Sequence, residues 1–323
     1  MPCYTPNKII KYPDGHIRFL GAMSNQEAQT LTIITDQGEY ISPVLVPCGQ
    51  CIGCRLDYSR TWASRCMLEA MDHETNYFLT LTYNDDHLPP GKKLLPTLVP
   101  EAMQLFIKRL RRHYEYTYGH TGIRFYGAGE YGDISGRPHY HIIAFNLPLQ
   151  DLTVFGKNEL GHTFYRSATL EALWPYGYVV IGECTWQSCA YTARYVVKKQ
   201  KGQTAGVYEE AGIYPEFCRM SRKPGIARNY FEANCDIIYD TDEIILPSVG
   251  KKLQSFSPPR YYDNLLKERN ELLLAKIKAK RGEKAEARVR LQMQQTDLSE
   301  EDYMDLKHTQ HKQSAKRLKR ILS

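Results

Sequence analysis

The chain has 323 residues, of which 42% are hydrophobic and 24% charged, with a formal net charge of +6. This length allows one large core with appendages, or two domains. The sequence has no apolar run near the roughly 18 residues that a membrane span requires and no signal-peptide pattern at its start. We therefore expect a protein that stays inside a cell and has no membrane partner.

Positive charge is concentrated at the C-terminal end. From Asp263 onward there are 15 Lys and Arg against 10 Asp and Glu, a net charge of +5, which leaves about +1 for the rest. Nucleic-acid contacts in the main body would therefore come from local clusters. Two basic clusters, which could equally be solvated helix faces, are Lys108, Arg109, Arg111 and Arg112, and Arg194, Lys198, Lys199 and Lys201.

The N-terminal segment contains short β-like stretches, predicted to be hairpins, followed by clustered cysteines. Cys48, Cys51 and Cys54 lie in "PCGQCIGC", and thiolates at this spacing can bind one ion. Cys3 could supply the fourth ligand of a tetrahedral zinc site. An iron–sulfur cluster is the competing metal centre, and unligated cysteines are the structural alternative. Disulfides are not expected, because the cytosol keeps thiols reduced.

The next elements alternate between helix and strand. Residues 55–71 have helical spacing, and residues 77–83, "YFLTLTY", are typical of a central strand. Thr97 and Pro100 open a helix that continues through "EAMQLFIKRLRRHYE", and its apolar stripe is expected to face the core. A further strand is predicted at residues 123–130.

The stretch "GRPHYHIIAF", residues 136–145, is predicted to form a hairpin with that strand. Side chains alternate along a strand, so His139 and His141 share one face and Tyr140 points the other way. A hydrogen-bonded pair would explain two such histidines, but imidazole is also a common metal ligand. Glu130 ends the paired strand, and its carboxylate would suit Mg²⁺ or Mn²⁺.

After a loop, a short helix at "ATLEALWPYG", a strand at "YVVIGEC" and a helix at residues 186–202 complete the predicted core. The order strand, helix, strand, strand, helix, strand, helix predicts an α+β fold: an antiparallel β-sheet backed by helices, ferredoxin-like with one helix added. We divide the chain into residues 1–75, with hairpins, cysteine knot and helix; 76–262, the core; and 263–323, a charged tail of one or two exposed helices.

The last core helix carries "YTARYVVK", with Tyr191 and Tyr195 four residues apart and Lys198 one turn beyond. Residues at i and i+4 lie on one helix face, so both phenols can point to one place. Core packing would explain such a pair, but the adjacent cations would be poor core neighbours. A nearby metal or ammonium group helps a phenol act as a nucleophile.

In chain order, "FLTLTY", "GRPHYH" with its upstream "GEYG", and "YTARYVVKK" resemble the three motifs of the HUH endonucleases. The segments "MPCYTP", "PCGQCIGCR", "TWASRC", "RPHYHIIAF" and "MSRKPGI" resemble more closely the replication initiator proteins of small single-stranded DNA bacteriophages, the microviruses and especially the gokushoviruses. The resemblance extends from Met1 to about residue 263.

The resemblance implies a site-specific DNA nickase and strand transferase. Glu130, His139 and His141 would hold Mg²⁺ or Mn²⁺ at the scissile phosphate of an origin in single-stranded or unwound DNA. One tyrosine would form a 5′-phosphotyrosine, and the freed 3′ hydroxyl would prime rolling-circle synthesis. The second tyrosine would cut the regenerated origin, while Lys198 would contact phosphate or stabilise the leaving group.

The same resemblance implies a structural role for the cysteine knot and a place in the cytoplasm of a bacterial host, with a host polymerase and helicase as partners. Other functions stay open. A histidine-triad hydrolase needs a third alternating histidine, but position 143 is Ile143. A non-catalytic DNA-binding or packaging protein would leave the histidines and tyrosines without a task, and plasmid initiators or transposases use related motifs.

Overall fold

The computed structural model describes residues 3–21, 30–35, 38–93, 95–132, 135–157, 161–198, 206–246 and 254–317, except for the side chains at 195–198, 254 and 315–317. The chain divides into two compact units. The first combines Met1–Asp57 with Thr296–Lys319, and the second is built from Tyr58–Gln295. The functional division that composition suggests, after residues 75 and 262, stays a prediction.

The first unit consists of small antiparallel sheets and one long helix. Its strands are β1 (Asn7–Lys11), β2 (Ile17–Phe19) and β5 (Val44–Val46), in the order β2-β1-β5, and a hairpin of β3 (Ile33–Ile34) and β4 (Tyr40–Ile41). The helix is α10 (Glu300–Arg317). Tyr4 is buried, its ring stacks on His308 at 4.7 Å and its hydroxyl hydrogen-bonds His311. The predicted hairpins are confirmed, and the tail helix packs on the N-terminal segment.

In the second unit, seven strands among the described residues form one sheet in the order β12-β7-β8-β6-β11-β10-β9, with every neighbouring pair antiparallel. The strands are β6 (Asn76–Tyr83), β7 (Arg124–Tyr131), β8 (Pro138–Phe145), β9 (Thr153–Lys157), β10 (Thr163–Arg166), β11 (Gly177–Glu183) and β12 (Phe217–Met220). The predicted antiparallel α+β sheet is confirmed. The sequence missed β9, β10 and β12, which are short and bury few side chains fully, so they lack a strong apolar pattern.

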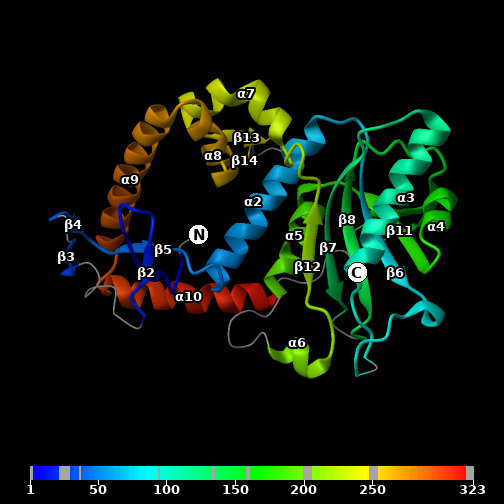
Figure 1. Ribbon diagram of the computed structural model, residues 1–323, viewed down its shortest axis with the longest axis horizontal. Helices are drawn as coiled ribbons and strands as arrows, with labels where there is room; N and C mark the ends of the chain where they lie inside the picture. Colours follow the sequence, from blue (N-terminus) through cyan, green and yellow to red (C-terminus); the bar gives the residue numbers. More distant parts are fainter. Residues whose placement is uncertain are drawn as a thin grey trace. The chain divides into compact units, whose positions relative to one another are not determined.

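Helices cover both faces of this sheet (Figure 1). Alternation along β8 places Tyr140 and Ile142 in a core with α3 (Pro100–Tyr118) and α4 (Ala168–Leu173), and places Ile143 and Phe145 in a second core with α5 (Trp186–Lys198) and α2 (Ile52–Met71). Pro100 occupies the first turn of α3, where no backbone donor is lost, and Gly119 ends it in the left-handed conformation.

Two short helices lie outside the second core, η1 (Asp85–His87) and α6 (Gly206–Ala211). The other elements extend it: α7 (Arg228–Thr241), β13 (Ile244–Leu246) paired with β14 (Gln254–Phe256), α8 (Arg260–Arg269) and α9 (Glu271–Met293). Leu265 and Leu266 of α8, and Leu274 and Ile277 of α9, are buried in that core. The expectation of an exposed tail is therefore wrong for this first part, because its apolar side chains share one helical stripe despite the charged composition.

Arg281 fixes α9 further, with its guanidinium bonded to Asp242 at 2.6 Å and to Asp263 at 2.8 Å. Most side chains beyond Arg281 in α9 are exposed, as expected for a charged helix. Among the residues that the structure describes, no helix combines the length and the apolar character needed to cross a membrane.

Candidate active site

Strand register brings the predicted ligands together on one face of the sheet. In the β7–β8 hairpin Glu130 pairs with His139, and in the β8–β6 pair His139 faces Thr82 while His141 faces Thr80. Because side chains alternate, all five lie on the sheet face that α5 covers. The predicted hairpin and the shared face of the two histidines are as the sequence indicated.

The imidazoles and the carboxylate converge on one point. Nε2 of His139 lies 3.0 Å from Oε1 of Glu130, and Nε2 of His141 lies 2.9 Å from the same oxygen. The three ligand atoms lie within 4.8 Å of one another. Glu130 is 1% exposed, whereas the His139 side chain is 18% exposed, so the group opens to solvent at His139. Two imidazole nitrogens and one carboxylate oxygen at this spacing fit a divalent transition metal or magnesium.

The Glu130 carboxyl is held in its ionised form. Burial alone would raise its pKa, but hydrogen bonds from His139 and His141 outweigh burial and hold the pKa well below its usual range. A buried carboxylate is therefore present at neutral pH. It accounts for the negative charge that a bound cation would neutralise.

Residues around the triad orient His141. Thr80 Oγ1 lies 3.1 Å from Nδ1 of His141, and the Phe78 ring stacks on the imidazole with centroids 5.5 Å apart. If Nδ1–H donates to the threonine, Nε2 can bind a cation, which is the arrangement that second-layer partners usually enforce on metal-binding histidines. The sequence predicted the "FLTLTY" strand but not this role of Thr80. The role could have been inferred only from period-2 alternation along the strand combined with its pairing to the histidine strand.

Tyr191 lies against the triad. Its ring centroid is 5.2 Å from that of His141, in an edge-on arrangement, and the residue is 7% exposed. A reciprocal cap at the start of α5 fixes this position, because the Thr185 amide donates to Ser188 Oγ at 2.8 Å and the Ser188 amide to Thr185 Oγ1 at 3.1 Å. Ser59 of α2 donates to the Ala190 carbonyl at 3.1 Å.

The second half of the predicted tyrosine motif is described only as backbone. Tyr195 and Lys198 belong to α5, but their side chains lie outside the described residues, as do Lys199 and Lys201 entirely. Arg194 is half-buried. The structure thus brings Tyr191 beside the triad, and the predicted roles of Tyr195 and Lys198 stay predictions.

The basic cluster of α3 lies on the sheet face opposite the triad. Nη2 of Arg109 donates to the Tyr176 hydroxyl at 3.3 Å, and Nε of Arg111 donates to the Ile123 carbonyl at 2.9 Å. These two hydrogen bonds thus stabilise the fold, although Arg111, like Lys108 and Arg112, is exposed. Contact between this cluster and nucleic acid stays a prediction.

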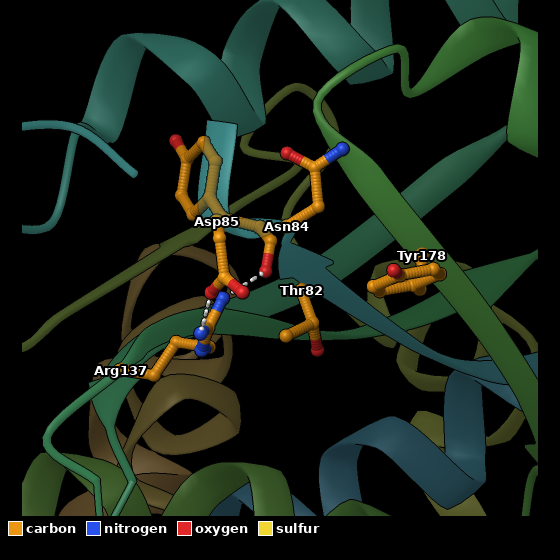
Figure 2. A pocket seen from close by; sticks show the side chains of 6 residues that line it. Thr82, Asn84, Asp85, Arg137 and Tyr178 are labelled. Carbon is orange, nitrogen blue, oxygen red and sulfur yellow. Dashed lines mark hydrogen bonds and ion pairs between the residues drawn. The ribbon is translucent and has the colours of Figure 1, made fainter. Parts of the chain in front are cut away.

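Beside the triad is a shallow pocket of about 170 Å³ that the sequence did not reveal. Figure 2 shows Arg137 at its edge, where Nη1 donates to the Tyr83 carbonyl at 2.7 Å and Nη2 forms an ion pair with Asp85. Its lining residues are Thr82, Tyr83, Asn84, Asp85, Arg137 and Tyr178. Arg137 lies in "GRPHYH", two residues before His139, and this closeness in sequence was the available signal.

The four cysteines form a separate group within the first unit. Sγ atoms of Cys3, Cys48, Cys51 and Cys54 lie within 4.8 Å of one another, and those of Cys3 and Cys51 are 3.9 Å apart. Tetrahedral zinc with Zn–S bonds of about 2.3 Å requires sulfurs roughly 3.8 Å apart. The geometry therefore fits a single tetrahedral ion better than a cluster of several metal atoms.

Hydrogen bonds to sulfur stabilise a thiolate at Cys48. Burial raises its pKa, but donors from Thr5, Cys51 and Gln50 lower the pKa to about 6. Burial raises the pKa of the Cys3 and Cys54 thiols, so a cation is needed to hold these two sulfurs as thiolates.

Comparison with known proteins gives one consistent family. The family model for replication-associated protein ORF2/G2P matches residues 76–200. The chain is 39% identical over 287 residues to the replication-associated protein ORF2 of Spiroplasma virus 4, covering 87% of this chain and 86% of that protein. It is 32% identical over 252 residues to the replication-associated protein VP4 of Bdellovibrio phage phiMH2K, covering 76% of each.

A third relative, the replication-associated protein ORF4 of Chlamydia phage 1, is 39% identical over 158 residues, covering 48% of this chain and 38% of that protein. No solved structure matches the chain. The segment that the family model matches, residues 76–200, contains Glu130, His139, His141 and Tyr191.

Proposed function

Because this chain belongs to the replication-associated protein ORF2/G2P family of microvirus-type phages, we propose that it initiates rolling-circle replication by nicking and rejoining single-stranded DNA. The observation that carries the proposal is the convergence of Glu130, His139 and His141 on one point with Tyr191 beside them. The strand order β7-β8-β6-β11, with α3 and α4 as connections, is that of a split βαβ sheet. This order supports a ferredoxin-like core of the HUH type.

In the proposed reaction the Tyr191 phenol attacks the scissile phosphorus. The bond from phosphorus to the 3′ oxygen breaks, a bond to the phenol oxygen forms, the phenol proton is lost, and the departing 3′ oxygen gains a proton. One phosphodiester is exchanged for another, so rejoining needs no nucleotide cofactor. Tyr195, four residues later on α5, would act on the regenerated origin, and Lys198 would contact phosphate.

Glu130, His139 and His141 would hold Mg²⁺ or Mn²⁺, which supplies Lewis-acid polarisation of the phosphate. Thr80 keeps the His141 ring oriented, and Phe78 packs against its face. The four cysteines would hold a structural Zn²⁺ in the first unit. Origin DNA is the proposed substrate, and a host polymerase and helicase are the proposed partners.

The test is formation of a covalent protein–DNA adduct. Full-length protein is incubated with labelled single-stranded oligonucleotides that tile the phage genome, with Mn²⁺ or Mg²⁺, and then denatured. We expect a labelled protein band, lost in Glu130→Ala and retained in Glu101→Ala, which changes an exposed glutamate in the first turn of α3.

Peptide mapping of the adduct assigns the nucleophile, with Tyr191→Phe and Tyr195→Phe tested singly and together. Absence of a band from every oligonucleotide with both metals would contradict nicking and favour a non-catalytic DNA-binding protein. An adduct at a residue other than these two tyrosines would contradict the assigned chemistry.

A further inference from the structure

We propose that the pocket beside the triad binds one unpaired DNA base next to the scissile phosphate, and that Tyr178 is the surface on which this base stacks. The inference rests on the proposed function, since it places the substrate of that reaction. It adds residues that the motifs of the sequence did not include.

The pocket and the triad lie in one row across the sheet. Glu130 pairs with His139, His139 with Thr82, and Thr82 with Tyr178, so residues from β7, β8, β6 and β11 follow one another on the same face. Neighbouring strands are about 4.8 Å apart, so Tyr178 is roughly 10 Å from His139 across the row. A nucleotide in the pocket would therefore adjoin a phosphate at the triad.

Tyr178 is exposed although its strand is internal to the sheet. The residue is 56% exposed, with β6 on one side of β11 and β10 on the other. Among the described residues α5 packs mainly on β7, β8 and β12, and its Tyr191 also contacts Phe78 of β6. An aromatic ring on an open sheet face offers its π-surface to a base, and such stacking requires a base that is not paired within a duplex.

Polar groups around the ring suit a base edge and a phosphate. Among the described residues, the Thr82 hydroxyl, the Tyr178 hydroxyl and the side-chain nitrogen Nδ2 of Asn84 have no hydrogen-bond partner, whereas Oδ1 of Asn84 accepts from the His87 backbone amide at 3.1 Å. That bond orients the Asn84 amide. The two bonds of Arg137 hold its guanidinium at the edge of the pocket (Figure 2).

The size of the pocket suits a single base. Its volume is about 170 Å³, and the Tyr178 ring can stack only on a base that is not paired within a duplex. The Tyr178 ring, the unpaired polar groups and the Arg137 guanidinium together fit single-stranded DNA that passes the triad.

The experiment measures binding separately from cleavage. Fluorescence anisotropy follows full-length protein binding to labelled 20-mers of dT, dA and dC without added Mg²⁺ or Mn²⁺. We expect Tyr178→Ala to weaken binding of at least one homopolymer by about 10-fold, since stacking of one base on an aromatic ring contributes on this scale. Tyr178→Trp should retain binding, because indole also stacks.

Tyr40→Ala is the matched control, because Tyr40 is 76% exposed but belongs to β4 of the first unit. Asn84→Ala should change the order of preference among the three homopolymers. The inference is overturned if Tyr178→Ala binds all three with wild-type affinity, or if Tyr40→Ala weakens binding as much.

The two proposals fail separately. An adduct formed by wild-type protein together with unchanged binding by Tyr178→Ala would refute the pocket and leave nicking intact. Weakened binding by Tyr178→Ala without any adduct would support the pocket as a single-stranded DNA site and refute nicking.

Discussion

Replacing Thr80 by valine tests whether the triad is a metal site oriented by its neighbours. Valine has the shape of threonine without the hydroxyl, so the change removes the 3.1 Å hydrogen bond to Nδ1 of His141 and leaves the packing of β6 intact. His141 is 2% exposed, so water is poorly placed to replace that partner. Losing one such bond and leaving a buried donor unpaired costs about 1.5–3 kcal/mol.

That cost corresponds to a metal affinity about 10- to 100-fold weaker, the range typical of lost second-layer partners. The assay titrates full-length protein with Mn²⁺. Calorimetry measures the binding affinity, and adduct formation gives the Mn²⁺ concentration at which half of the maximal adduct is formed. Thr80→Ser keeps a hydroxyl and should stay close to wild type. Equal Mn²⁺ affinity for Thr80→Val and wild type, with both variants folded, would refute the orienting role.

Three further predictions concern stability. Cys51→Ser should release bound Zn²⁺ and make α10 sensitive to protease, measured by metal analysis and limited proteolysis; full zinc content with an intact α10 would contradict the structural site. Leu266→Ala should lower the free energy of unfolding by about 2–4 kcal/mol. Leu272→Ala changes a residue that is 78% exposed and should alter this free energy little. Equal denaturation midpoints for the two variants would show that α8 does not pack as described. Burial raises the pKa of Glu69, but hydrogen bonds from His73, the Ala227 amide and Arg124 outweigh burial and lower this pKa. The ionised Glu69 carboxylate therefore stabilises the fold above the unfolded pKa near 4.5, and this stabilisation is lost as pH falls through the lower folded pKa. Glu69→Gln should therefore lower the melting temperature at pH 7 and approach wild type below pH ~4; a difference independent of pH would argue against this charge.

Much of the site could be predicted because it is local in sequence. One hairpin contains Glu130, His139 and His141, and period-2 alternation suffices to put both histidines on one face. Pairing of an adjacent strand end then places the carboxylate beside them. No long-range information was needed for this part.

The remaining features depend on contacts between distant segments. Thr80 reaches His141 only because β6 pairs with β8, and Tyr178 joins the row only because β11 pairs with β6. Neither pairing has a signal in the local pattern. The burial of Leu266 likewise depends on α8 packing against the second core. Composition does not reveal this packing, because charged neighbours mask the apolar stripe of α8.

The first unit is assembled from the two ends of the sequence, and this has a consequence for synthesis. Tyr4 packs against His308 and His311 of α10, yet roughly 240 residues separate Asp57 from Thr296. At a translation rate of about 5–20 residues per second, the cysteine segment leaves the ribosome roughly 12–48 s before its helical partner is made. The sheet that carries the triad is complete in the nascent chain during that interval, so the newborn protein acquires its proposed catalytic face first and closes its amino-terminal module last.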